Sequence, residues 1–180
     1  MIELHSQNWK KFLMSDLFYI KGISKRKDDI FDCAETGMYP VLSTKATNNG
    51  VAGFSDTYTE LGGVLVIETA CIGYCSYQKQ NFSGTGHLAV LRPKTFHMND
   101  RIALFLVTVL NRECKFYNYG RKRTLSRIRA SYIYLPSKYD KEHSKFMPDF
   151  QLMDQYMKSL LQGSDQGRDG GVKLTFSWNS

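Results

Sequence analysis

The longest nearly unbroken apolar segment of the chain follows a polar start in the sequence Asn99-Asp100-Arg101-Ile102-Ala103-Leu104-Phe105-Leu106-Val107-Thr108-Val109-Leu110. The side-chain oxygen of Asn99 or Asp100 is suited to cap the first turn of a helix. From Ile102 to Leu110 all residues except Thr108 are apolar, which predicts a helix that is buried on most of its sides. Such a helix requires other elements packed around it.

Short runs before and after this helix have the character of strands. Residues 64–67 (VLVI) and 88–91 (LAVL) are apolar and bounded by Gly or Pro, so we predict two buried strands. Residues 39–43 predict a strand in which Pro40 lies at a strand end or a sheet edge, because proline has no N–H to donate. Asn49-Gly50 predicts a tight turn between extended segments.

Three further segments complete the prediction of an α+β fold. Residues 73–78 alternate as in a half-exposed strand, which places Tyr74 on the face opposite Tyr77 and favours Tyr74 as the core residue. Residues 132–136 alternate too and predict a last strand that Pro136 ends. Residues 9–20 are apolar at mixed spacing, so helix and strand both remain open there.

The end of the chain differs in kind. Pro148 suits a first helical position and Gly163 a helix end, which predicts a helix over 148–162 after a domain of residues 1–147. Phe150, Met153, Met157 and Leu160 follow 3-4-3 spacing, as in a coiled-coil seam that binds a partner or a second copy. An amphipathic helix docked on its own domain explains the spacing equally well. Residues 163–180 begin as a flexible linker by composition.

The positive charge is concentrated in one segment. Residues 112–129 hold seven Lys or Arg and one acid, Glu113, so they account for +6 of the net charge of +7. Tyr117, Asn118, Tyr119 and Gly120 lie among these cations. Cations neutralise phosphates, and aromatic or amide side chains stack on or hydrogen-bond to bases, so the mixture favours a nucleic acid as the partner.

Several other classes of protein fit the sequence poorly. There is no run of eighteen apolar residues and no signal-peptide pattern at the N-terminus, which predicts a cytoplasmic protein without a membrane segment. Cys33, Cys71, Cys75 and Cys114 lack zinc-site spacing, so we expect reduced thiols and no metal. The chain also lacks glycine-rich nucleotide loops and the motif for amino methylation of a base, so we expect no cofactor.

One faint enzymatic pattern is present. Glu113-Cys114-Lys115, with Asp100 upstream, resembles the acidic and lysine residues of a metal-dependent nuclease. Glu113 and Lys115 lie at the end of the predicted helix, however, and not on a strand. We therefore expect any chemistry to lie in partner subunits.

The order of several segments resembles a known family. These are Trp9 to Gly22, Tyr39 to Ser43, Asn48 to Phe54, Tyr77-Gln78 with Phe82, Tyr119 to Lys122, Ile133 to Pro136, and Pro148-Asp149-Phe150. Together they are similar to a target-recognition domain of the DNA-specificity subunits of type I restriction-modification systems, and of related systems that cut on both sides of their site.

The resemblance implies a fold and partners. It implies an α+β recognition domain with a twisted, mainly antiparallel sheet, one buried helix, and a C-terminal helix like the start of a spacer coiled coil. It further implies a non-catalytic subunit that binds double-stranded DNA and directs methyltransferase subunits, and a restriction subunit in some systems, to their target. Such subunits usually hold two recognition domains, and Trp178-Asn179 is similar to Asn8-Trp9, as at the start of a second copy. A homodimer formed through the 148–162 helix would supply the second recognition domain.

Within this interpretation particular residues are candidates for DNA contacts. Arg121, Lys122 and Arg123 are the leading phosphate contacts, and Asn pairs well with adenine. The role of Asn49 is also explained by turn geometry alone. The full candidate set is Lys45, Asn48, Asn49, Tyr77, Gln78, Lys79, Lys115, Tyr117, Tyr119, Arg121, Lys122 and Arg123.

Two alternatives remain open from the sequence. Tyr117 and Tyr119 with the surrounding cations also suit an RNA-binding or single-strand-binding module that stacks bases. A pure interaction protein, whose basic segment meets an acidic partner, is the third interpretation.

Overall fold

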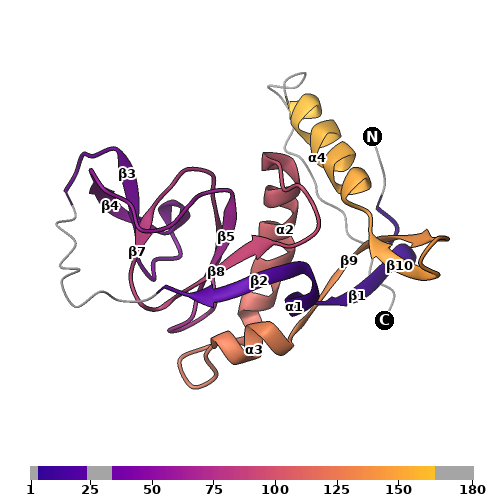
Figure 1. Ribbon diagram of the computed structural model, residues 1–180, viewed down its shortest axis with the longest axis horizontal. Coiled ribbons are helices and arrows are strands. Elements are labelled where there is room, and N and C mark those ends of the chain that lie inside the picture. The colour runs from indigo at the N-terminus through magenta and orange to yellow at the C-terminus, as the bar shows by residue number, and fades with distance from the viewer. Residues whose placement is uncertain (1–3, 24–33, 165–180) are drawn as a thin grey trace.

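The fold was analysed in a computed structural model, which describes residues 4–23 and 34–164 (Figure 1). A four-stranded sheet and the helix α2 (Asp100–Arg112) form its centre, and a three-stranded sheet lies at each end of the long axis. Strand pairing is antiparallel except between β3 (Tyr39–Leu42) and β7 (Ser83–Gly84). The prediction of a mainly antiparallel α+β fold is therefore confirmed, with the strands distributed over three sheets.

The central sheet has the order β2-β8-β5-β6 and holds both predicted buried strands. Its strands are β2 (Phe18–Gly22), β8 (Leu88–Pro93), β5 (Val64–Glu68) and β6 (Cys75–Gln78). All of β5 is buried, because α2 packs on one face and Phe82 with its neighbours covers the other. The central sheet therefore has one apolar layer on each of its two faces.

The predicted helix and its cap are both confirmed. The side chain of Asn99 accepts a hydrogen bond from the N–H of Ile102 at 2.9 Å, which satisfies one of the free donors of the first turn. At the other end, the Asn111 amide makes two hydrogen bonds, of 2.7 and 2.9 Å, with the N–H and carbonyl of Cys75. α2 therefore also satisfies backbone groups of the edge strand β6.

The ambiguous segment near the N-terminus is a strand, a single helical turn and another strand. β1 (Trp9–Leu13) follows a short 3-10 turn, η1 (Ser6–Asn8), and α1 (Met14–Leu17) leads into β2. β1 joins the sheet β1-β9-β10 with β9 (Tyr132–Asp140) and β10 (Lys145–Pro148). The prediction that Pro136 ends its strand is wrong. β1 pairs with β9 up to Pro136 and β10 pairs from Ser137 on, so the proline stands where the partner strand changes.

The third sheet has the order β4-β3-β7, with β4 (Val51–Ser55) paired to β3. β3 is its middle strand, but β7 pairs only with Val41 and Leu42. Pro40, near the start of β3, therefore has no pairing partner on β7, and its missing N–H costs no hydrogen bond on that side. The expected turn before β4 contains the 3-10 segment η2 (Asn48–Gly50). Asn48, Asn49 and Gly50 all have positive φ, a backbone region that Asn and Gly tolerate best.

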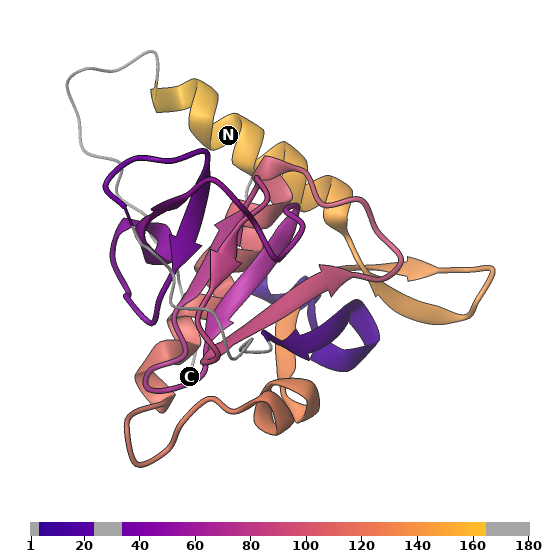
Figure 2. The same cartoon turned by 60° about the vertical axis from the view of Figure 1, so that its left-hand side comes forward.

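The C-terminal helix α4 (Phe150–Ser164) begins two residues later than predicted. Pro148 is the last residue of β10, and Asp149 is the cap, since its carboxylate accepts from the N–H of Leu152 at 3.0 Å. α4 lies along α2 (Figure 2), and its Asp154 pairs with Arg101 at 2.8 Å and accepts from Asn99 at 2.6 Å.

The predicted seam of α4 faces its own domain. Met153 is fully buried in the main core, and Phe150 and Met157 pack against the same core, with the Phe150 ring stacked on Phe96 at 3.9 Å. Leu160 is half-buried. The docked alternative therefore describes this helix from Phe150 to Met157. Across residues 4–23 and 34–164, no helix combines the length and the apolar composition needed to cross a membrane.

Candidate nucleic-acid interface

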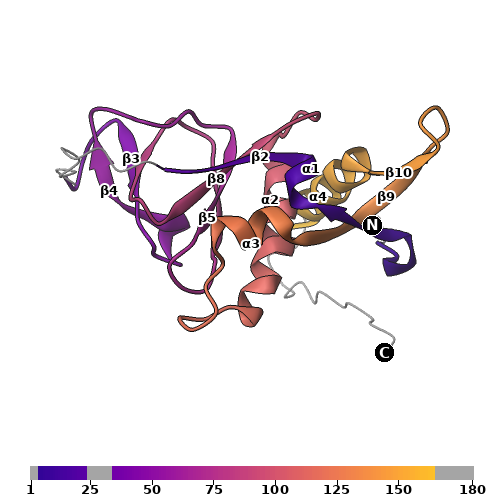
Figure 3. The same cartoon turned by 60° about the horizontal axis from the view of Figure 1, so that its bottom comes forward.

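The basic segment leaves the end of α2 as a 3-10 turn, η3 (Glu113–Phe116), and re-enters the fold at α3 (Leu125–Ala130). Between them, residues 117–122 form an exposed loop, the basic turn, which projects beside α3 (Figure 3). Thr124 caps α3 by accepting from the N–H of Arg127. The guanidinium of Arg127 donates to the carbonyl of Lys122 at 2.6 Å, so α3 also supports the basic turn.

The basic turn is closed by short-range hydrogen bonds. The N–H of Arg121 donates to the backbone carbonyl of Asn118 at 3.0 Å and to its side-chain oxygen at 2.9 Å. Tyr119 at the tip is 76% exposed, and the ammonium of Lys122 lies 4.6 Å from its ring centre. Lys115 and Arg121 are exposed, whereas Tyr117 and Lys122 are half-buried. Four of these five predicted residues therefore lie on the basic turn, and Lys115 lies just before it in η3.

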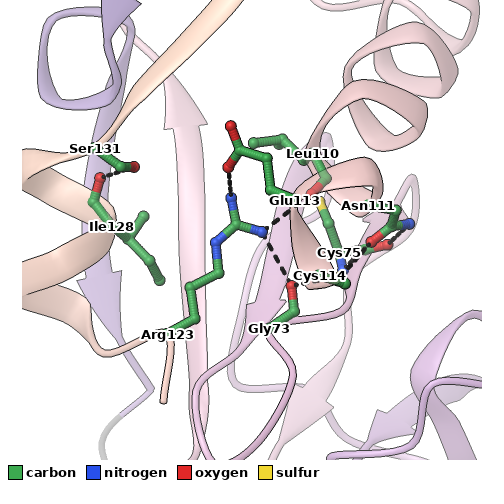
Figure 4. A network of polar contacts seen from close by, with 9 residues as sticks. All are labelled: Gly73, Cys75, Leu110, Asn111, Glu113, Cys114, Arg123, Ile128 and Ser131. Carbon is green, nitrogen blue, oxygen red and sulfur yellow. Dashed lines mark hydrogen bonds and ion pairs between the residues drawn. The ribbon is translucent and has the colours of Figure 1, made fainter. Parts of the chain in front are cut away.

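Arg123 is not a phosphate contact, and that prediction is wrong. Its side chain is fully buried, and its Nη1 donates to the carbonyls of Gly73 at 3.1 Å and Leu110 at 3.2 Å (Figure 4). Its Nη2 donates to Glu113 at 2.6 Å. A buried guanidinium is stable only when its charge is paired and most of its donors are used. Here both terminal nitrogens have partners, and Nε is buried without one among the described residues. Arg123 anchors the basic turn to the body of the protein.

Glu113 is the acid of this buried pair. Burial raises the pKa of its carboxyl above the ordinary value, and the positive charge of Arg123 opposes that shift. Because its carboxylate faces Arg123 in a 3-10 turn, the faint nuclease pattern of Glu113 and Lys115 has no structural counterpart.

Sequence reasoning missed the loop that Arg123 touches. Residues 69–74, the 69–74 loop, are organised by the buried carboxylate of Glu68, which accepts from the N–H groups of Ala70, Cys71 and Gly73, the last two at 2.6 and 3.0 Å. Gly73 has φ +75°, and a Cβ there would lie 2.3 Å from Cδ of Arg123. The available signal was an acid, Glu68, directly after the predicted buried strand 64–67, but only the contacts in the folded chain show its role.

The second group of candidates surrounds the edge strand β6. The Asn49 side chain donates to the carbonyl of Tyr77 at 2.8 Å, and Gln78 donates back to the carbonyl of Asn49 at 2.9 Å. Gln78 is only 3% exposed, so the prediction that it contacts DNA is wrong. It holds the Asn49 loop on β6 instead, and the exposed side chains of Lys45 and Asn48 belong to that same loop.

Tyr77 and Lys79 share one acidic partner. The Tyr77 hydroxyl donates to Asp100 at 3.2 Å and the Lys79 ammonium lies 2.6 Å from the same carboxylate. The hydrogen bond from Lys79 lowers the pKa of Asp100, and burial raises the pKa of Tyr77. Asp100 offsets the charge of Lys79, so this group attracts anions less strongly than the basic turn.

The basic turn and the group of candidates around β6 are connected through the 69–74 loop. Lys45, Glu68 and Tyr74 line one small pocket, while Gly73 in the same loop contacts Arg123. Tyr74, predicted to belong to the core, is half-buried at this pocket. Burial also raises the pKa of its hydroxyl.

Comparison with known proteins identifies the family. The sequence model of the family described as type I restriction modification DNA specificity domain matches residues 6–165. The chain belongs to this family. The predicted resemblance is thus confirmed, and with it a role in DNA target recognition rather than catalysis.

Individual relatives of this specificity domain agree with the family match. The chain is 26% identical over 161 residues to the specificity subunit S.BcgI of a type II restriction enzyme from Heyndrickxia coagulans, covering 87% of this chain and 45% of that protein. The fold is similar to the S subunit of a type I restriction-modification system from M. genitalium, with a TM-score of 0.60, 14% identity, and 92% of this chain and 41% of that one covered.

A second solved structure has the same fold. The HsdS subunit from Thermoanaerobacter tengcongensis matches with a TM-score of 0.53 and 13% identity, covering 88% of this chain and 39% of that one. The specificity domain described here therefore spans less than half the length of these relatives.

Metal-binding groups in the described part of the specificity domain are few. Asp140, Glu142 and His143 bring ligand atoms within 4.8 Å of one another on the turn between β9 and β10. His143 already lies 2.8 Å from Asp140, and exposed groups of this kind are common without a metal. Cys71, Cys75 and Cys114 form no disulfide in the described part of the chain, and burial raises the pKa of Cys75 to about 12. Cys33 lies outside the described residues.

Proposed function

We propose that the chain binds double-stranded DNA in a sequence-dependent way and supplies one half of the recognition surface of a restriction-modification complex. The observation that carries the proposal is the rigid attachment of the basic turn. Lys115, Arg121 and Lys122 lie on a segment that Arg123 and α3 hold against the core. Cations held in this way bind a regular array of phosphates with little loss of conformational freedom.

Phosphate binding and base reading are assigned to different side chains. Lys115, Arg121 and Lys122 contact phosphates, which fix the register of the protein on the duplex without carrying sequence information. Lys45, Asn48 and Asn49 lie in the loop that Gln78 holds on β6, and we assign base contacts to this loop and to Tyr77. Asn49 has one donor engaged with Tyr77 and keeps its side-chain carbonyl for a base.

The positions of cations over the aromatic rings in and beside the basic turn favour duplex DNA over a single strand. The cations of Lys122, Lys115 and Arg123 lie over the rings of Tyr119, Phe116 and Tyr117, at 4.6, 5.1 and 5.1 Å. A module that stacks unpaired bases needs free ring faces. Here each ring already has a cation on one face, so stacking with a base is restricted to the opposite face.

The chain further directs methyltransferase subunits, together with a restriction subunit where one is present, to the target. We propose residues 1–147 as the recognition domain and 148–162 as the start of the helix that links it to those partners. One domain reads half of a split target, so a second copy or a second domain supplies the other half. The linker and possible second copy proposed for 163–180 lie largely outside the described residues.

Competition among nucleic acids tests this function. The chain is mixed with a labelled pool of random 30-base-pair duplexes, and unlabelled duplex DNA, single-stranded DNA or RNA of equal length is added at several salt concentrations. The proposal expects duplex DNA to compete best, and repeated selection to enrich a common sequence. Equal or better competition by single strands, or a selected pool without a common sequence, would overturn it.

A further inference from the structure

The 69–74 loop stands between the two groups of candidate residues, although it carries no charge. We propose that residues 69–72 form a further recognition element that contacts base edges, held in register with the basic turn by Arg123. The inference rests on the duplex binding proposed above. It assigns base contacts to a segment that no local sequence pattern singles out.

The loop is organised before any ligand binds. Glu68, at the end of β5, is 2% exposed, and its carboxylate receives three backbone N–H groups of the loop. The N–H of Thr69 donates to the carbonyl of His87 at 2.9 Å, and the N–H of Glu68 to that of Tyr74 at 2.9 Å. Recognition elements held in this way lose little freedom on binding.

The same loop is locked to the basic turn at Gly73. The carbonyl of Gly73 accepts from Arg123 at 3.1 Å and from the thiol of Cys114 at 3.5 Å (Figure 4). The absence of a side chain at Gly73 lets the stem of Arg123 pass directly over its backbone. Because Arg123 directly follows Lys122, a shift of the 69–74 loop also displaces the basic turn.

The chemistry of residues 69–72 fits bases better than phosphates. A phosphate needs cations or free backbone N–H groups, but Glu68 already uses the N–H groups of Ala70, Cys71 and Gly73. Thr69, Ala70 and Ile72 are half-buried and expose the remainder of uncharged, methyl-bearing side chains. Such side chains contact the thymine methyl group in the major groove.

Affinity for selected and scrambled duplexes tests this role. A duplex is selected with the 180-residue chain, and a scrambled duplex of equal composition serves as reference. Ile72→Ala and the milder Ile72→Thr are compared with Leu161→Ala, an exposed position on α4, and with Arg121→Ala. Thermal melting is recorded for each variant, and binding is measured at least 10 °C below its midpoint.

The expected results separate base contacts from phosphate contacts. Both Ile72 variants weaken binding to the selected duplex by about fivefold or more and leave the scrambled duplex unchanged. Arg121→Ala weakens both duplexes, and Leu161→Ala weakens neither. An unchanged ratio between the two duplexes in both Ile72 variants would overturn the role of the loop and leave duplex binding intact. A wild-type chain that does not distinguish the two duplexes would overturn the proposed function itself.

Arg123→Lys tests whether Arg123 holds the 69–74 loop and the basic turn in a fixed relative position. Lysine keeps the charge next to Glu113, but its single ammonium cannot repeat the fixed fork of donors to Gly73, Leu110 and Glu113. We expect faster hydrogen exchange in residues 118–122 of the free protein and a reduced ratio between selected and scrambled duplexes. Faster exchange with an unchanged ratio would show Arg123 to be structural only and would overturn its positioning role.

Discussion

Nη2 of Arg123 lies 2.6 Å from Oε2 of Glu113, and the two side chains close the base of the basic turn. The arginine is fully buried, whereas the side chain of the acid is 24% exposed. Neither residue is free to contact DNA in this arrangement. The basic turn is therefore held in place by Arg123, a cation that is itself buried.

The raised pKa of Glu113 predicts how this pair depends on pH. A carboxyl with a raised folded-state pKa binds its proton more tightly in the folded protein, so it stabilises the fold at low pH and loses that contribution as pH rises through the folded-state pKa. Glu113→Gln removes this dependence. We expect the unfolding free energy of the wild type, minus that of the variant, to decrease between pH 4 and pH 7 in urea titrations. An increase over the same range would show that Arg123 depresses the pKa instead.

Gly73 cannot be replaced without loss of stability. Alanine there combines a positive φ with a Cβ that meets the stem of Arg123, which predicts a loss of about 2–5 kcal/mol in denaturant unfolding. Gly63 is the matched control, because its φ is +69° but a Cβ there meets nothing within 4 Å. Gly63→Ala is expected to lose only about 1 kcal/mol. Equal losses in the two variants would contradict the close packing at Gly73.

Met153 distinguishes a docked helix from an intermolecular seam. Because it is fully buried in the main core, Met153→Ala is expected to lower the unfolding free energy by about 2–5 kcal/mol at any protein concentration. The exposed Leu161 of the same helix is the control, with an expected loss below about 0.5 kcal/mol on substitution by Ala. A loss at Met153 that varies with protein concentration would indicate that this position binds a second copy.

Asp100 is expected to restrain DNA binding near β6. Asp100→Asn removes the carboxylate that pairs with Lys79, so the ammonium becomes available to a phosphate. Affinity for any duplex should rise, and the slope of log affinity against log salt should steepen by up to about 0.9. Asp16→Asn, at an exposed position of α1, makes the same change in net charge. If the two variants bind alike, Lys79 does not lie at the interface.

The sequence predicted those elements whose signals are local. The apolar run after Asn99 and its cap, and the strands around Val66 and Val90, appear as expected because burial and capping are encoded in consecutive residues. Pro136 and Pro148 were misplaced, since each occupies a strand position that only the partner strands explain.

The candidate site was predicted as a region but not residue by residue. Arg121, Lys122 and Arg123 are adjacent cations, and no local pattern marks the third as buried, because its partners Gly73 and Leu110 lie 50 and 13 residues away. Gln78 was misassigned for a similar reason: the loop that covers it comes from Asn49, 29 residues earlier.

The salt dependence of duplex binding tests whether the basic turn and the adjacent Lys115 neutralise DNA phosphates. Affinity of the 180-residue chain for its selected duplex is measured between about 50 and 200 mM salt, for the wild type and for a variant in which Lys115, Arg121 and Lys122 are replaced by Ala. If the basic turn grips the phosphates, the variant binds every duplex more weakly, and its salt slope is shallower by about 0.9 for each phosphate that it no longer neutralises. An unchanged slope and affinity in a folded variant would show that these three cations do not contact DNA phosphates.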